Sequence, residues 1–311
     1  MRWYVKSLIF KALSLVPGGI QLYNYSQHQI SRSTAPTPAR ILQKLRIGLD
    51  YWHWLEQHGR TKAVNGAAVV DLGAGWHPTI PFLFHQLGAQ RQVLLDVSPL
   101  MTDELVASTL DLFHSAWPLE SKKTSNLPPP PAAPAPARSR SQIFEARGIE
   151  YLAPYQGRFV EADRFDSAFS TQVLQHIPEE MMTAVFKEVF TWLKPGGLFL
   201  ATTHLTFQFG SPDTNPYQYQ HLTISPTAWR RWFSSRIMYF NRFKGPDYRR
   251  ALEAAGFRIV ALQNTPPSAV DQTYFAATKV HACFAHLAPE DLAARHLFFV
   301  AEKPQPESVE R

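Results

Sequence analysis

The sequence predicts an α/β fold: a Rossmann-like, mainly parallel seven-stranded sheet with helices on both faces. Three observations predict it. Short apolar segments rich in β-branched and aromatic residues alternate with segments whose apolar residues recur at helical spacing. A glycine turn directly follows the first of the expected strands. The 311 residues are 45% hydrophobic and 18% charged, which is enough apolar material for a real core.

The first 65 residues are predicted to form an N-terminal helical cap. Apolar residues between 5 and 16 recur at helical spacing, and a second helix is expected at 41–59. The first helix is interpreted as one that packs on the domain, and the alternative is peripheral membrane contact through residues 1–16. Lys11 interrupts its apolar stretch, which is shorter than the roughly 20 residues of a membrane span. No small-residue cleavage site follows, so a signal peptide is not expected.

The first half of the sheet is predicted from a regular succession of elements. In chain order, we expect a strand at 67–73, a helix at 78–89, a strand at 91–97, a helix at 101–117, and strands at 148–154 and 165–174. Residues 124–141 are rich in proline, which neither pairs in a sheet nor continues a helix. Because the strand and helix pattern resumes directly afterwards, this stretch is expected to be a flexible surface insertion.

The second half continues the pattern and defines where a ligand should bind. We expect a helix at 178–194 closed by a Pro-Gly-Gly turn, a strand at 198–205, a helix at 245–257, and strands at 258–264 and 296–304. In a parallel sheet of this kind the ligand lies at the carboxyl ends of the strands. This edge is expected to carry Gly73, Asp96, Ala153, Ser170 and His204.

Composition limits the classes of partner and of site. The net charge of +6 favours anionic partners only weakly, because the basic residues are spread along the chain. The single cysteine, Cys283, excludes an intrachain disulfide and a cysteine-based zinc cluster. A reducing compartment, the cytoplasm, is therefore the expected location. The twelve histidines have no metal-ligand spacing, so no metal site is expected.

The glycine turn "DLGAGWHP" predicts an adenosine site without a pyrophosphate. Asp71 ends the first strand, and Gly73 and Gly75 let the backbone bend tightly and leave space for a ligand. A dinucleotide site would carry a third glycine where this chain has Pro78, a residue suited to the first turn of a helix. Asp96 follows the second strand at a distance suited to accepting hydrogen bonds from both ribose hydroxyls.

Four segments in this order, "DLGAGWHP", "LLDVSP", "FDSAFSTQVLQHIPEE" and "LKPGGLFLATTH", resemble the class I S-adenosylmethionine-dependent methyltransferases, small-molecule type. The resemblance runs from about Gly66 to Lys303. It implies a methyltransferase domain at 66–303, S-adenosylmethionine as cofactor, and methyl transfer to an oxygen, nitrogen or carbon nucleophile of a small-molecule acceptor. Residues 205–248 would then form an acceptor-side cap, and residues 304–311 a tail.

The resemblance also assigns the residues around the cofactor. Asp71, Gly73 and Gly75 would surround its methionine part, Asp96 would hold the ribose, and Val97 belongs to the same motif. These residues lie at the ends of the first two strands of the expected sheet. It agrees with the ribose interpretation of Asp96 that the residues themselves support.

The segment after the fourth strand would border the methionine end of the cofactor and the reaction centre. The cofactor-binding residues implied there are Ser170, Thr171, Gln172 and His176, the last at the histidine of the family's "LxHI" pattern. Many members also carry an acidic residue after the third strand, near the adenine amino group. This chain has Ala153 and Pro154 there, which leaves the adenine contact to the backbone or to Tyr155.

Two histidines are candidate general bases. His204 ends the fifth strand at the ligand edge, and His221 lies in the segment that follows, so either imidazole could take a proton from an acceptor. In the alternative interpretation these histidines only pack. Other functions also remain open: a nucleic-acid methyltransferase that uses the basic aromatic segment 229–250, and a non-catalytic binding protein on the same scaffold.

Overall fold

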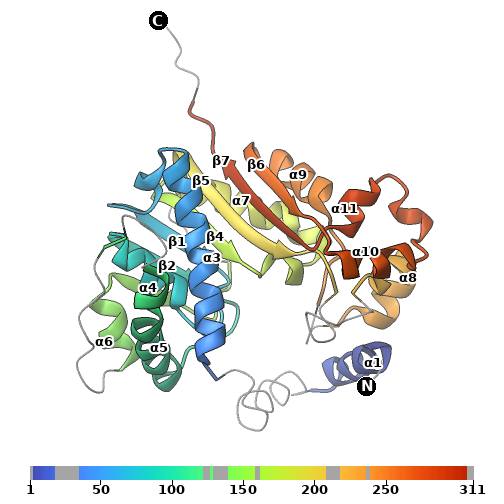
Figure 1. Cartoon of the computed structure of the whole chain (residues 1–311), viewed down its shortest axis with the longest axis horizontal. Coiled ribbons are helices and arrows are strands. Elements are labelled where there is room, and N and C mark those ends of the chain that lie inside the picture. The colour runs from blue at the N-terminus through green and yellow to red at the C-terminus, as the bar shows by residue number, and fades with distance from the viewer. Residues whose placement is uncertain are drawn as a thin grey trace, which may run out of the picture. The chain divides into compact units, whose positions relative to one another are not determined.

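The strands of the described residues form one seven-stranded sheet (Figure 1). The computed structural model describes residues 3–17, 35–121, 127–128, 139–157, 162–207, 218–235 and 239–306. The strand order is β3-β2-β1-β4-β5-β7-β6. The bounds are β1 Ala68–Leu72, β2 Arg91–Leu95, β3 Ile149–Leu152, β4 Phe165–Thr171, β5 Leu193–His204, β6 Arg258–Thr265 and β7 His296–Glu302.

The sheet is mixed, and its first part is parallel. Strand β1 pairs in parallel with both β2 and β4, and β2 pairs in parallel with β3. Hydrogen bonds between β5 and β7 follow the antiparallel pattern: the N–H of Gly196 donates to Lys303, and the N–H of Lys303 donates to Gly197. The predicted Rossmann-like, mainly parallel sheet is confirmed.

The chain divides into two compact units. The β1–β4 unit comprises Thr34–Thr171, Glu188–Leu200 and Glu302–Arg311, and the β6–β7 unit comprises Met1–Ser33, Gln172–Lys187 and Ala201–Ala301. Strand β5 and helix α7 (Met182–Trp192) contribute residues to both.

In the β1–β4 unit, the helices lie beside the sheet and pack against one another (Figure 1). They are α3 (Pro38–Gln57), α4 (Thr79–Gln86), α5 (Asp103–Ser121) and α6 (Arg140–Glu145). Helix α3 begins at Pro38 because the Thr37 hydroxyl caps it by accepting the N–H of Arg40 at 3.3 Å. A Cβ atom at Gly48 would lie 2.6 Å from Leu83 of α4, so glycine there permits the close approach of the two helices.

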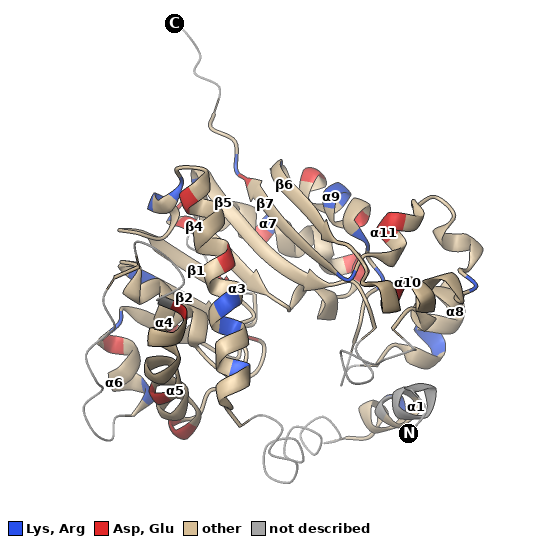
Figure 2. Cartoon of the chain, viewed as in Figure 1, with Lys and Arg blue, Asp and Glu red and all other residues tan. Residues whose placement is uncertain are grey.

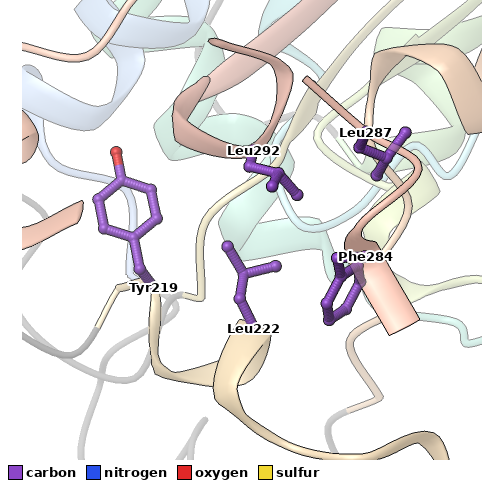
Figure 3. Packing of buried hydrophobic residues seen from close by; sticks show 5 residues of the cluster. All are labelled: Tyr219, Leu222, Phe284, Leu287 and Leu292. Atoms are coloured by element: carbon purple, nitrogen blue, oxygen red, sulfur yellow. The ribbon is translucent and has the colours of Figure 1, made fainter. Parts of the chain in front are cut away.

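The β6–β7 unit has a small apolar core of its own. Besides the first part of α7, its α-helices are α1 (Trp3–Leu15), α8 (Pro226–Ala228), α9 (Gly245–Ala254), α10 (Ala269–Ala276) and α11 (Pro289–Ala293). It also has 3₁₀ turns at Leu174–His176, Glu179–Met181, Gln220–Thr223 and Ala282–Phe284 and a π-helical turn at Trp229–Phe233. Figure 3 shows the side chains of Tyr219, Leu222, Phe284, Leu287 and Leu292 packed in one cluster. The Tyr219 hydroxyl donates to the carbonyl of Ala293 at 2.7 Å, so the ring is buried with its polar atom satisfied.

The Pro-Gly-Gly turn expected after the helix at 178–194 is wrong, because β5 begins at Leu193 and Gly196 pairs with Lys303. Most of the expected insertion at 124–141 lies outside the described residues, as do parts of the expected cap at 205–248. The domain boundaries stay predictions. Among the described residues, no helix combines the length and hydrophobicity that a membrane span requires.

Candidate functional site

The glycine turn after β1 is anchored to the end of β2. The backbone N–H groups of Gly73 and Ala74 both donate to the carbonyl oxygen of Leu95, at 2.8 and 3.0 Å. Gly73 and Gly75 have φ values of 83° and 68°, in the left-handed region that favours glycine. Among the described residues, a Cβ atom at Gly75 would meet only the ammonium nitrogen of Lys44 within 4 Å, at 3.9 Å. The space in front of Gly75 is therefore open to a ligand.

The carboxylate of Asp96 is buried and already oriented. Its side chain accepts the N–H of Gly75 on Oδ2 at 2.8 Å and the N–H of Ser98 on Oδ1 at 3.0 Å. Burial raises the pKa of Asp96, and these backbone donors oppose the rise. Each carboxylate oxygen has a second lone pair, so both remain able to accept a hydroxyl. The next side chain, Val97, is 77% exposed, which leaves an apolar surface beside the carboxylate.

An acidic side chain, Asp71, and a basic one, Lys44, interact at the same glycine turn. Burial raises the pKa of Asp71 to about 7, while the Lys44 ammonium opposes the rise and the Asp96 carboxylate adds to it. Burial lowers the pKa of Lys44, and Asp71 and Asp96 oppose that change. Lys44 lies in the first half of α3, where Figure 2 shows the basic residues of that helix. The turn therefore has one basic group, the ammonium of Lys44, and one acidic group, the carboxyl group of Asp71.

Tyr51 of α3 contacts the end of β4. Its hydroxyl donates to the carbonyl oxygen of Ser170 at 3.1 Å and lies 3.1 Å from the hydroxyl of Thr171. The side chain of Ser170 is fully buried and donates to the carbonyl of Leu72 at 3.0 Å. Ser170 thus joins β4 to β1 through its hydroxyl, and Thr171 is the residue of this pair whose hydroxyl faces α3.

The residues after β3 contact Asp96 through the backbone. The peptide bond between Ala153 and Pro154 is cis, and the N–H of Tyr155 donates to the carbonyl oxygen of Asp96 at 2.7 Å. The Tyr155 hydroxyl donates to the carboxylate of Glu188 at 3.1 Å. The backbone of this segment therefore supports the Asp96 loop, while the Tyr155 ring contacts α7.

In the β6–β7 unit, the turn after β4 is held in an unusual conformation. Gln172 has a φ of 57°, and its N–H donates to the carbonyl of Thr202 at 2.8 Å. The side-chain amide of Gln175 donates back to the carbonyl of Gln172 at 2.8 Å, and its carbonyl oxygen accepts the hydroxyl of Thr203 at 2.7 Å. A non-glycine residue at positive φ persists only where its surroundings fix it, as they do here.

His176 has a defined tautomer in this turn. Its Nδ1 lies 2.7 Å from the carbonyl oxygen of Tyr239, which can only accept, so Nδ1 carries the proton. Nε2 is left as an acceptor, 3.4 Å from the amide nitrogen of Gln175. The imidazole can therefore accept a hydrogen bond from a neighbouring group.

Asn241 closes the same turn, and sequence reasoning missed it. Its amide nitrogen donates to the carbonyls of Leu174 and Ile177 at 2.8 and 3.0 Å, and its backbone N–H donates to Gln175 at 2.8 Å. The residue is 2% exposed. Nothing local predicts this role, because the partners lie more than sixty residues earlier in the chain.

The two candidate bases have different surroundings. His204 is half-buried at the end of β5, its ring centroid 4.5 Å from that of His296, and burial together with His296 lowers its pKa to about 3. His221 is fully buried beside Phe207 and Phe240. Neither of its ring nitrogens makes a hydrogen bond of good geometry, although the Gln218 backbone lies near the ring. Both imidazoles are therefore neutral at pH 7.

Residues 37–262 match a family model described as a methyltransferase domain. The chain belongs to the class I S-adenosylmethionine-dependent methyltransferases. It is an enzyme of the transferase class, and the cofactor of the family is S-adenosylmethionine. The family match includes α3, which the predicted domain, beginning at residue 66, left to the N-terminal cap.

Several solved structures similar to this chain are described as methyltransferases, at low sequence identity. A methyltransferase from Mesorhizobium loti is 20% identical, with a TM-score of 0.42, over 77% of this chain and 92% of that one. A protein from Galdieria sulphuraria that is assigned as a sarcosine dimethylglycine methyltransferase is 14% identical, with a TM-score of 0.44. The match covers 82% of this chain and 86% of that one. A comparison with curated protein sequences finds no significant match.

The residues of the β1–β4 unit fit the cofactor of this methyltransferase. The open space at Gly75 leaves room for a ligand, the oriented carboxylate of Asp96 suits the hydroxyls of a ribose, and the exposed Val97 offers an apolar surface to a base. Lys44 and Tyr51 are the additions that sequence reasoning missed. Their spacing of seven residues, two helical turns, was the signal available, because it puts both on one face of α3.

Proposed function

We propose that this methyltransferase transfers the methyl group of S-adenosylmethionine to an oxygen, nitrogen or carbon atom of a small-molecule acceptor. The observation that carries the proposal is the hydrogen bond between Gly75 and Asp96, which presets a carboxylate for a ribose beside an open glycine turn. The cofactor supplies an electrophilic methyl group on a sulfonium. The work of the protein is to align the acceptor and exclude water.

The cofactor-binding residues follow from this placement. In the β1–β4 unit, Asp71, Gly73 and Gly75 would bind the methionine part, Asp96 the ribose, and Val97 the flat face of the base. Further residues assigned to the cofactor or the reaction centre are Ser170, Thr171, Gln172 and His176. Of these, Ser170 would act through its backbone, since its hydroxyl is committed to Leu72.

His204 and His221 are the candidates for accepting a proton from the methyl acceptor. With a pKa of about 3, His204 is neutral at pH 7, so it can accept a hydrogen bond from an acceptor hydroxyl or amine but holds a full proton poorly. His221 is enclosed by aromatic side chains, and its role as a base stays a prediction. His204 is therefore the first residue to test as an orienting base.

A small-molecule acceptor is favoured over a nucleic acid by the packing of segment 229–250. Trp229 and Phe240 are 3% and 4% exposed, and both pack against Phe207. Arg242 donates to the carbonyl of Ile224 at 2.6 Å. Trp229 and Phe240 are therefore closed to stacking on bases, and Arg242 is held by the backbone. The exposed aromatic and basic side chains at the start of the segment are Trp232, Arg230 and Arg231.

Membrane contact through residues 1–16 is a second, separate proposal. Leu15 of α1 is 75% exposed, and α1 packs against the π-helical turn, where Trp232 is 49% exposed. Arg230 and Arg231 are exposed beside that indole. Apolar side chains next to arginines suit an anionic lipid surface. Co-sedimentation with anionic vesicles, but not with neutral ones, is the expected result; equal recovery in both pellets contradicts it.

The acceptor class is tested with a labelled methyl group. The purified enzyme is incubated with S-adenosylmethionine tritiated at the methyl group and a cell extract, and the products are separated by size. Label in the small-molecule fraction supports the proposal, and label in nucleic acid supports the alternative. The Asp96→Ala variant, which should not bind the cofactor well, is the control for label that transfers without the enzyme.

A further inference from the structure

We propose that Lys44 and Asp71 together bind the amino-acid end of the cofactor, the ammonium of Lys44 its carboxylate and the carboxylate of Asp71 its ammonium. This inference rests on the proposed placement of the cofactor at the glycine turn. It adds a residue of α3 to the site and assigns a charge to each side of the turn. All of the residues that carry it lie in the β1–β4 unit.

The side chain of Lys44 extends to the open space at Gly75. Its ammonium nitrogen lies 3.9 Å from the Cβ position of Gly75, so it borders the space that the glycine leaves open. It donates one long hydrogen bond, of 3.4 Å, to the carbonyl oxygen of His77. An ammonium has three N–H donors, so Lys44 has capacity for an anion at the turn.

The charged groups around Lys44 are two carboxyl groups and one guanidinium. Lys44 faces Asp71 and Asp96, and Arg40 adds a like charge from the same helix. Asp96 is already held by two backbone donors, whereas the carboxyl group of Asp71 interacts electrostatically with both Lys44 and Asp96. A half-buried lysine and a half-buried carboxylate match the two charges of an amino-acid zwitterion. Charge-assisted hydrogen bonds of this kind are stronger than neutral ones.

Helix α3 is held in place by contacts with the end of β4 and with α4. Tyr51 lies two helical turns after Lys44, roughly 10 Å along the axis. Its hydroxyl bonds the end of β4 at Ser170 and Thr171. Gly48, between them, allows α3 to lie close to α4. Tyr51 is thus a positioning residue that fixes the helix face from which Lys44 reaches the turn.

The experiment compares a ligand that carries the amino-acid group with one that lacks it. S-adenosylhomocysteine carries the amino-acid zwitterion, and 5′-methylthioadenosine has the same adenosine and sulfur without it. Affinities are measured by calorimetry for the wild type, Lys44→Met and Lys44→Arg. Lys62→Met is the matched control, because Lys62 is exposed and belongs to the same unit. Melting curves verify that each variant is folded.

The wild type should bind S-adenosylhomocysteine more tightly than 5′-methylthioadenosine. Lys44→Met should lose about tenfold or more for the first ligand, roughly 1.4 kcal/mol, and stay within about twofold for the second. Lys44→Arg should recover part of the loss, and Lys62→Met should behave as the wild type. An equal loss for both ligands, or none, overturns the inference and leaves the cofactor assignment standing. A folded wild type that binds neither ligand overturns both.

Discussion

The carboxylate of Asp96 accepts the backbone N–H of Gly75 across 2.8 Å, so the residue proposed to hold the ribose also holds the glycine turn. One hydrogen bond thus couples the ends of β1 and β2. Its partner on the other carboxylate oxygen, the N–H of Ser98, fixes the plane of the group. This coupling means that changes in the turn should be felt as changes in cofactor affinity.

Gly75→Ala tests the turn and has a matched control in the same unit. Gly75 and Gly59 have φ values of 68° and 63°, and an added Cβ would clash with no described atom at either position. Both substitutions should therefore cost about 1–2 kcal/mol of unfolding free energy, measured by denaturant titration. Only Gly75→Ala should also weaken S-adenosylhomocysteine binding. Equal affinities in the two variants would contradict the placement of the cofactor at this turn.

Asn241→Leu tests the clamp on the turn after β4. The substitution removes the amide donor from the carbonyls of Leu174 and Ile177, of which only that of Leu174 keeps another donor, the N–H of Ile177 at 3.1 Å. The loss should cost about 1–3 kcal/mol in unfolding free energy. Denaturant titration measures the loss. Ser115→Ala, at an exposed helical hydroxyl, serves as the control and should change stability little. If Asn241→Leu unfolds at the same denaturant concentration as the wild type, the clamp is not a stabilising contact.

The low pKa of His204 predicts how stability depends on pH. Its pKa is about 3 in the folded protein and about 6.5 in the unfolded chain, so the unfolded chain binds more protons between these values. The contribution of this group is fully present above pH 6.5 and is lost as the pH falls toward 3. By pH 5 the loss should be about 1–2 kcal/mol. His204→Gln should show a flatter profile of unfolding free energy over this window, and a profile parallel to that of the wild type would contradict the assignment.

The sheet and the cofactor turn were predictable because their signals are local. Apolar β-branched runs predicted the strands, and the glycines of the turn after Asp71 predicted a backbone that needs positive φ, as found at Gly73 and Gly75. Pro78 was expected to begin a helix, and it is the residue directly before α4. The class of the enzyme followed from the order of these motifs, which the family match confirms.

Other parts depend on partners that are distant in sequence. The segment at Gly196 was taken for a turn, but its N–H pairs with Lys303 near the end of the chain, which makes it a strand. Asn241 bonds carbonyls that precede it by more than sixty residues. Lys44 and Tyr51 could be placed on one helix face from their spacing, but which edge of the sheet that face covers depends on tertiary packing.

Calorimetric titration of the wild type with S-adenosylhomocysteine and with NAD, repeated for Asp96→Ala, tests the central claim most directly. The turn has no third glycine for a pyrophosphate, so the wild type should bind S-adenosylhomocysteine and not NAD. Asp96→Ala should lose roughly 1.5–3 kcal/mol for each ribose hydrogen bond removed. Tight binding of NAD without binding of S-adenosylhomocysteine, or an affinity that Asp96→Ala leaves unchanged, would contradict the account.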